Sequence, residues 1–191
     1  MFYLLALQPL LDHTGKYFSY YRYSIVNNED LEWPWLHGIA FSNPPTSPLR
    51  LKLEDDDDAG EFADFVLNPI PLVTERFRKV LENCGVSNVD YYPVVMDNIE
   101  GFEDFPKYFA INVIGKVAAA DPSKSNYNET FGQMGANNFD KFVLNHNAVA
   151  GLDFFILAEH LSSVVVSERV KAESEKEGID TLRFDPIESL S

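Results

Sequence analysis

Two stretches of the chain repeat one pattern: VTERFRKVLENCGVSNVDYYPV at residues 73–94 and VSERVKAESEKEGIDTLRFDPI at residues 166–187. They align without a gap at a constant offset of 93 residues, from Val73 to Val166. Each copy starts with Val-Thr/Ser-Glu-Arg, has a glycine near its middle and ends on aromatic-x-proline. The same local structure is therefore predicted twice.

The first copy predicts a capped helix followed by a strand. Its apolar residues recur at helical spacing and would form one buried stripe: Val73, Phe77, Val80, Leu81 and Cys84. The hydroxyl of Thr74 can accept an unpaired backbone N–H as an N-cap, and Glu75, which Arg76 follows, suits the positive end of the helix dipole. Gly85 supplies the left-handed residue that ends a helix, and the alternating segment after it predicts a strand around Pro93.

The second copy keeps the residues that start and stop these elements: Ser167, Glu168, Arg169, Gly178 and Pro186. It departs on the apolar stripe, where Glu173, Ser174 and Glu177 replace Val80, Leu81 and Cys84. We expect this helix to be less buried and held by charge pairs such as Arg169 with Glu173. Because arginine cannot act as a base, the twin Glu-Arg pairs favour capping and pairing over catalysis.

These signals predict an α+β fold with a mixed or antiparallel sheet, in which strands outnumber helices. The repeat-related helices at 74–84 and 167–177 should each be followed by a strand. With 191 residues and 46% apolar content, residues 1–191 should form a single domain with a sizeable core. The aromatic-rich segment 17–35 is either a binding platform or core packing, and residues 121–140 predict a long surface loop.

Net charge is the unusual feature of the composition, since 30 acidic and 15 basic residues give −15. Such a surface repels nucleic acid and anionic membranes and attracts basic partners. Much of the charge lies in two runs, at 54–64 and 97–104, which we expect to be exposed loops. Their candidate partner-binding residues are Asp55, Asp56, Asp57, Asp58, Glu61, Asp97, Glu100, Glu103 and Asp104. The alternative is that these loops serve solubility only; the first run lacks the ligand spacing of a calcium loop.

No constellation of residues indicates an enzyme, a metal site or a cofactor. The four histidines show no metal-ligand spacing, and no phosphate-binding glycine loop or nucleophile elbow is present. The single cysteine, Cys84, belongs to an apolar helical stripe, so we expect a buried, inert thiol in a reducing compartment. The apolar N-terminus is short, contains a proline and lacks a basic start, which favours a buried first strand and a cytoplasmic protein.

The repeated unit and the strand between its copies resemble a family of bacterial immunity proteins, first catalogued as a domain of unknown function. The matching motifs are Thr74–Phe77, Gly85–Pro93, Ile111–Val113, Asp121, Ser125 and Ser167–Arg169. The resemblance covers residues 65–188 and leaves residues 1–60 without a matching motif. Two departures are Thr74 in place of the family's serine, which still provides a cap, and the polar second helix.

Genes of that family lie beside polymorphic toxin genes. The resemblance therefore implies a non-enzymatic inhibitor that binds a cognate toxin in the cytoplasm and protects the producing cell during interbacterial competition. It supplies no toxin-binding residues. The acidic composition adds that the toxin would present a basic surface, such as the active site of a nuclease. The alternative function is a non-enzymatic binding or scaffold protein of a secretion or phage gene cluster.

Overall fold

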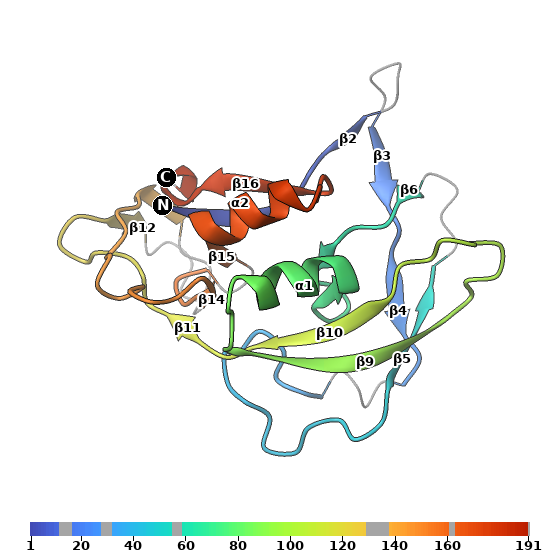
Figure 1. The fold of residues 1–191 in the computed structure, drawn as a ribbon. Coiled ribbons are helices and arrows are strands. Elements are labelled where there is room, and N and C mark those ends of the chain that lie inside the picture. Colours follow the sequence, from blue (N-terminus) through green and yellow to red (C-terminus); the bar gives the residue numbers. More distant parts are fainter. Residues whose placement is uncertain (12–16, 28–31, 55–58, 129–137, 161–162, 191) are drawn as a thin grey trace.

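The computed structural model describes residues 1–11, 17–27, 32–54, 59–128, 138–160 and 163–190, which form an α+β fold of mixed sheets (Figure 1). The larger sheet has the order β4 (Tyr23–Ile25), β5 (Leu49–Leu53), β9 (Val89–Asp97), β10 (Tyr108–Val113), β8 (Leu72–Thr74), β7 (Phe65–Val66). The second sheet has the order β11 (Lys116–Val117), β14 (Phe154–Leu157), β15 (Val164–Ser167), β1 (Phe2–Leu7), β16 (Leu182–Pro186).

Two small sheets lie beside these. One pairs β12 (Asn126–Asn128) with β13 (Asn138–Lys141), and the other has the order β2 (Leu10–Leu11), β3 (Tyr17–Tyr20), β6 (Ala59–Glu61). The helical elements are α1 (Glu75–Asn83), α2 (Glu168–Lys176) and the 3-10 turn η2 (Ile187–Leu190). Helices α1 and α2 lie next to each other between β16 on one side and β10 on the other (Figure 1).

The duplicated sequence forms the predicted structure in both copies. The hydroxyl of Thr74 accepts from Phe77 N at 3.2 Å at the start of α1, and Ser167 accepts from Val170 N at 3.5 Å at the start of α2. Gly85 follows the first helix at φ +69°, a left-handed conformation that favours glycine, and its counterpart in the second copy has the same angle. Strands β9 and β16 come next, so the predicted fold class and both predicted helices are confirmed.

The structural duplication extends upstream of the sequence repeat, to a hairpin that precedes each helix. Phe65 in β7 pairs with Val73, and Phe154 in β14 pairs with Val166. An aspartate precedes each of these phenylalanines, and its carbonyl accepts from the backbone N–H of the cap residue at 3.0 Å and 2.9 Å. The offset here is 89 residues instead of 93, because the second hairpin has a connection four residues longer.

Each copy, with its upstream hairpin, helix and following strand, forms one half of the molecule: the first half contains α1 and the second contains α2. The N-terminal strand completes the second half. In the first half, Phe109 of β10 pairs with Val73 on one side and Pro93 on the other. In the second half, Tyr3 of β1 pairs with Val166 and Pro186 in the same way. Strand β1 therefore occupies the place of β10, although β10 follows β9 in the chain and β1 comes from the opposite end.

The two halves contact each other reciprocally, as the subunits of an isologous dimer do. Asn88 and Thr181 are equivalent residues of the two copies. The Asn88 amide donates to the Phe154 carbonyl at 2.8 Å, and the Thr181 hydroxyl donates to the Asp64 carboxylate at 2.8 Å. Each residue thus holds the hairpin of the other half, which gives the molecule a pseudo-two-fold arrangement.

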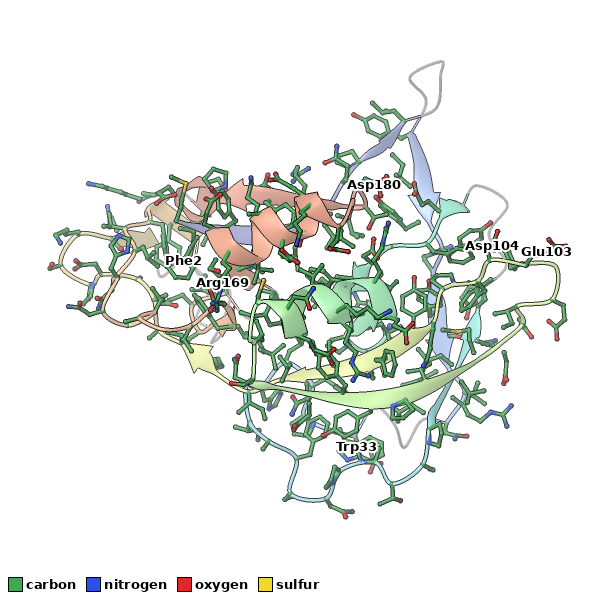
Figure 2. All side chains as sticks on the ribbon, in the orientation of Figure 1. Phe2, Trp33, Glu103, Asp104, Arg169 and Asp180 are labelled. Atoms are coloured by element: carbon green, nitrogen blue, oxygen red, sulfur yellow. The ribbon has the colours of Figure 1, made fainter. Side chains whose placement is uncertain are left out.

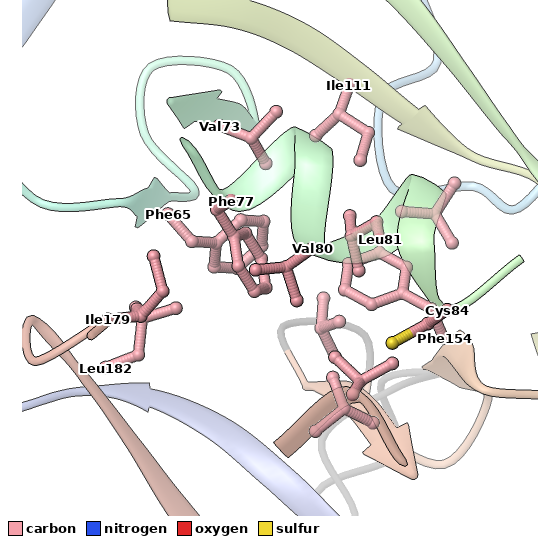
Figure 3. Packing of buried hydrophobic residues seen from close by; sticks show 14 of the residues in the cluster. Phe65, Val73, Phe77, Val80, Leu81, Cys84, Ile111, Phe154, Ile179 and Leu182 are labelled. Atoms are coloured by element: carbon pink, nitrogen blue, oxygen red, sulfur yellow. The ribbon is translucent and has the colours of Figure 1, made fainter. Parts of the chain in front are cut away.

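One shared core lies between the halves. Phe77, Val80 and Leu81 of α1 are fully buried against Phe154 and against side chains of both sheets (Figure 3). From α2, Val170 and Ser174 are fully buried. As predicted, α2 contributes less apolar surface to the core than α1, because a serine stands where α1 has Leu81.

The outer face of each repeated sheet is covered by a different layer. On the larger sheet, Phe41 and Trp35 pack on Tyr92 of β9 in one cluster with Leu51 of β5, and the ring centroids of Trp35 and Phe41 are 4.9 Å apart. The second sheet is covered by a separate cluster: Ala119, Phe139, Phe142, Leu144, Val149 and Ile187. Because these layers bury the outer faces, the central strands are buried on both faces, and their sequences are almost continuously apolar.

The structure corrects two details of the sequence analysis. Arg169 pairs with Asp153 instead of Glu173, and Glu173 pairs with Lys176 at 3.0 Å. Asp153 precedes β14 by one residue and comes within reach only when the hairpin folds back. Within the predicted loop at 121–140, the ends pair as β12 and β13, because Phe139 is anchored in the outer core; residues 129–137 lie outside the described part.

Asp64 connects the hairpin, the first helix and the opposite half. Its side chain is 2% exposed and accepts from Thr74 Oγ1 at 2.5 Å, Thr181 Oγ1 at 2.8 Å and Arg76 Nη2 at 2.6 Å. Asp153 has the same role toward Ser167 and Arg169, with its side chain 21% exposed. A buried carboxylate is tolerated only when its oxygens are satisfied in this way.

Replacing Asp64 with Ala should lower the free energy of unfolding by about 3 kcal/mol, because two buried hydroxyls and one guanidinium lose their acceptor. Urea denaturation followed by circular dichroism measures the change. Asp185→Ala is the control: it removes an exposed pair with Arg183 and should cost less than about 1 kcal/mol. Equal losses in the two variants would contradict the assigned role of Asp64.

Cys84 is 3% exposed at the end of the α1 stripe, and burial raises the pKa of its thiol. We expect native protein to react with a disulfide-exchange reagent far more slowly than urea-unfolded protein, since the thiolate is the reactive species. Rapid labelling of the folded protein, monitored by absorbance, would show that the thiol is accessible.

Candidate functional site

The acidic turn between β9 and β10 separates into paired and exposed carboxylates. Asp97 accepts from Arg50 of β5 through both oxygens, each at 2.9 Å. Glu100, Glu103 and Asp104 are exposed, and no ion pair joins them to another described residue. Figure 2 shows Glu103 and Asp104 on the part of this turn farthest from the helices. These three residues are therefore available to a partner, whereas Asp97 is already engaged.

Aromatic packing holds this turn against the segment that carries Glu61. Phe62 lies 5.4 Å from Phe102 and 4.9 Å from Phe105, measured between ring centroids, and it stacks on Tyr21 at 4.4 Å. The described ends of the two acidic runs are thereby brought together, although some 40 residues separate them in the chain. Of the predicted site residues, Asp55, Asp56, Asp57 and Asp58 lie outside the described residues.

A second acidic cluster lies where β6 approaches the end of α2. Arg76 Nη2 is 2.6 Å from Asp64 and 3.7 Å from Asp180, whose side chain is 79% exposed (Figure 2). Burial raises the pKa of Glu61, and the charges of Asp180 and Asp64 raise it further, against the opposing effect of Arg76. Burial and the same three carboxylates raise the pKa of Tyr20 to about 12. Three carboxylates therefore lie near a single arginine, Arg76, and the local charge is negative.

Glu61 was predicted as a site residue from its acidic run, whereas Asp180 was not predicted. Asp180 follows the glycine that ends α2 and belongs to no acidic run. Only the reciprocal packing of the two halves places it near Glu61, so no local pattern could have indicated it.

The repeated Glu-Arg pairs have structural contacts. Glu75 pairs with Lys107 at 3.3 Å, and Glu168 accepts from the Tyr3 hydroxyl at 2.5 Å. Arg76 and Arg169 each pair with the aspartate of their own hairpin. The remaining motif residues (Thr74, Gly85, Pro93, Ser167, Gly178 and Pro186) lie at helix ends and in paired strands.

Within the described residues, no three side chains of metal-binding type gather at one point. The same part of the chain contains no helix with the length and apolar character needed to span a bilayer.

Glu61→Gln should raise the melting temperature at pH 7. Since the folded state raises the pKa of Glu61 above its unfolded value, the ionised side chain destabilises the fold as pH rises through that range. The advantage of the variant should vanish near pH 4, where the carboxyl of the wild type is largely protonated in both states. Thermal unfolding at both pH values measures this, with Glu100→Gln as the exposed control; a gain independent of pH would argue against the electrostatic cause.

A family model described as Immunity protein family (Imm11) matches residues 13–189. The match spans both copies of the repeat and begins upstream of residues 65–188, the part in which the sequence motifs were found. No curated protein matches the chain. Because the model covers nearly all of the sequence, the resemblance drawn from the helix motifs is confirmed, and this chain belongs to the Imm11 immunity protein family.

Proposed function

We propose that this protein binds a cognate antibacterial toxin in the cytoplasm and neutralises it without catalysing a reaction, protecting the producing cell. The family match over residues 13–189 is the observation that carries this function. The toxin would belong to a polymorphic toxin system and be encoded beside this protein's gene.

The acidic turn is the proposed contact surface. Glu100, Glu103 and Asp104 are exposed and unpaired among the described residues, next to the segment that holds Glu61. Asp55, Asp56, Asp57 and Asp58, which lie outside the described residues, are proposed as further toxin contacts from the sequence alone. Asp97 contributes less, because Arg50 already neutralises it. Such a surface suits a toxin with a basic active site, for example a nuclease that binds phosphates.

Charge should act mainly on the rate of association. A net charge of −15 attracts a basic partner over distances of about one Debye length, roughly 8 Å at physiological salt. Exposed charges at the rim of an interface change the association rate and its salt dependence more than the lifetime of the complex.

The test replaces Glu103 with Gln and Asp104 with Asn together. Association with the toxin should slow several-fold at low salt, and the difference from wild type should shrink as salt rises. Stopped-flow fluorescence measures the rate, and growth of toxin-expressing cells measures protection. Replacing Asp55, Asp56, Asp57 and Asp58 with Asn tests the other acidic run in the same assays.

The control is Asp140→Asn with Glu188→Gln, which removes the same charge from the exposed surface of β13 and η2. It should slow association less than the turn variant. If both double variants bind at the same rate, the turn is a solubility feature. If wild-type protein neither binds the toxin nor protects cells, the proposed function is wrong.

A further inference from the structure

An apolar groove of about 580 Å³ separates the N-terminal strands from β7. Its lining includes Leu5 and Leu7 of β1, Leu10 of β2, Tyr17 of β3, Phe65 of β7 and Leu67, which follows β7. Strands β2 and β3 form an arm that projects from the body beside it (Figure 1). Leu7 at the end of β1 and Leu11 and Tyr17 on this arm are 40%, 54% and 70% exposed, so large apolar side chains surround the groove on the surface.

The pseudo-two-fold arrangement shows what occupies the equivalent place in the other half. Since β1 is equivalent to β10, the short strand β2 after β1 is equivalent to β11 after β10. Strand β7 is likewise equivalent to β14. In the second sheet, β11 pairs with the outer edge of β14 in parallel, with Lys116 opposite Ile156 and Val117 opposite Leu157.

Backbone hydrogen bonds from β14 and from the residue after it hold β11 in place. Ile156 N donates to Gly115 O at 3.1 Å, and Ala158 N donates to Val117 O at 2.8 Å. The residue of β7's edge equivalent to Ile156 is Leu67, which lines the groove. In the described part of the chain no strand pairs with this outer edge of β7.

Prolines explain why β2 does not take that place. Gly115, at φ +132°, makes the turn from β10 into β11, and its equivalent is Pro9, whose ring fixes φ near −65°. The equivalent of Ala158 is Pro69, which has no N–H to donate. Strand β2 therefore turns away and pairs with β3, with Leu11 opposite Tyr17, and the groove remains where β11 would lie.

We infer that this groove binds a short extended segment of the toxin, which adds to the edge of β7 in parallel as β11 adds to β14. The inference rests on the proposed function. Strand addition gains affinity from backbone hydrogen bonds and specificity from pockets for alternate side chains. Of the two donors that hold β11, this edge keeps one: the Leu67 N–H would donate to a carbonyl of the segment, whereas Pro69 has no N–H to offer. Apolar side chains of the segment would pack among Leu5, Leu7 and Tyr17.

Charge decides between a toxin segment and a second copy of this chain. The lining includes Arg22 and Tyr20, and the pKa of Tyr20 is raised mainly by burial and further by the charges of Glu61 and Asp180. A second copy would bring another net charge of −15 and be repelled. The apolar lining and the net charge of the whole chain thus favour an apolar segment of a basic toxin.

The binding test uses Leu7→Ser combined with Tyr17→Ser, in the full-length protein with the toxin encoded beside its gene. Affinity should fall by about 10-fold or more, mainly through faster dissociation, because exposed apolar anchors carry much of an interface's energy. The control, Val26→Ser with Ile39→Ser, removes side chains that are 43% and 53% exposed elsewhere and should change affinity less than about 2-fold. Surface plasmon resonance measures both.

Hydrogen exchange of the complex locates the contact without mutation. The Leu67 amide should exchange more slowly when the toxin is bound. Wild-type binding with unchanged exchange at Leu67 and unchanged affinity in the groove variant overturns this inference but leaves the proposed function intact. Absence of any wild-type binding overturns both. Protection of Leu67 that grows with the concentration of the isolated protein would identify a second copy as the occupant and overturn the assignment to the toxin.

Discussion

Two aspartate carboxylates organise the structure, because each ties a hairpin to the helix that follows it. Asp64 and Asp153 accept from the hydroxyl that caps the helix and from the arginine two residues later. One carboxylate thus fixes the end of a strand, the start of a helix and the angle between them. Asp64 also accepts from Thr181 in the opposite half, so the same buried group sets how the halves meet.

The halves share their interior but differ outside. Both helices and the inner faces of both sheets contribute to one core around Phe77 and Phe154. On the outer faces, the first half carries an aromatic layer around Phe41, and the second carries a cluster around Phe155. The acidic turn is anchored in the aromatic layer through Phe102. Because only the first half has this layer, the surface proposed for the toxin is also present in the first half only.

The differences between halves have local causes in single residues. A glycine at 115 allows a strand to cross to the other half, and a proline at the equivalent position 9 prevents it. The helix stripe likewise ends in Cys84 in one copy and in an exposed glutamate in the other. A near-symmetric scaffold therefore presents two unlike faces, an acidic turn and an apolar groove, which an immunity protein can direct at one toxin.

The sequence by itself determined both helices, their caps, their glycine stops and the strands that follow, because these depend on contacts within a few residues of the chain. It also indicated the family and the acidic runs, since composition and motif order are local properties. Tertiary structure decided the rest. It joined residues that are separated in sequence: Arg169 pairs with Asp153, β1 is the counterpart of β10, and Asp180 approaches Glu61. The upstream hairpins were not found as part of the sequence repeat, because their connections differ in length and shift the alignment offset. Long-range pairing of this kind depends on how both halves pack, and no local pattern encodes it.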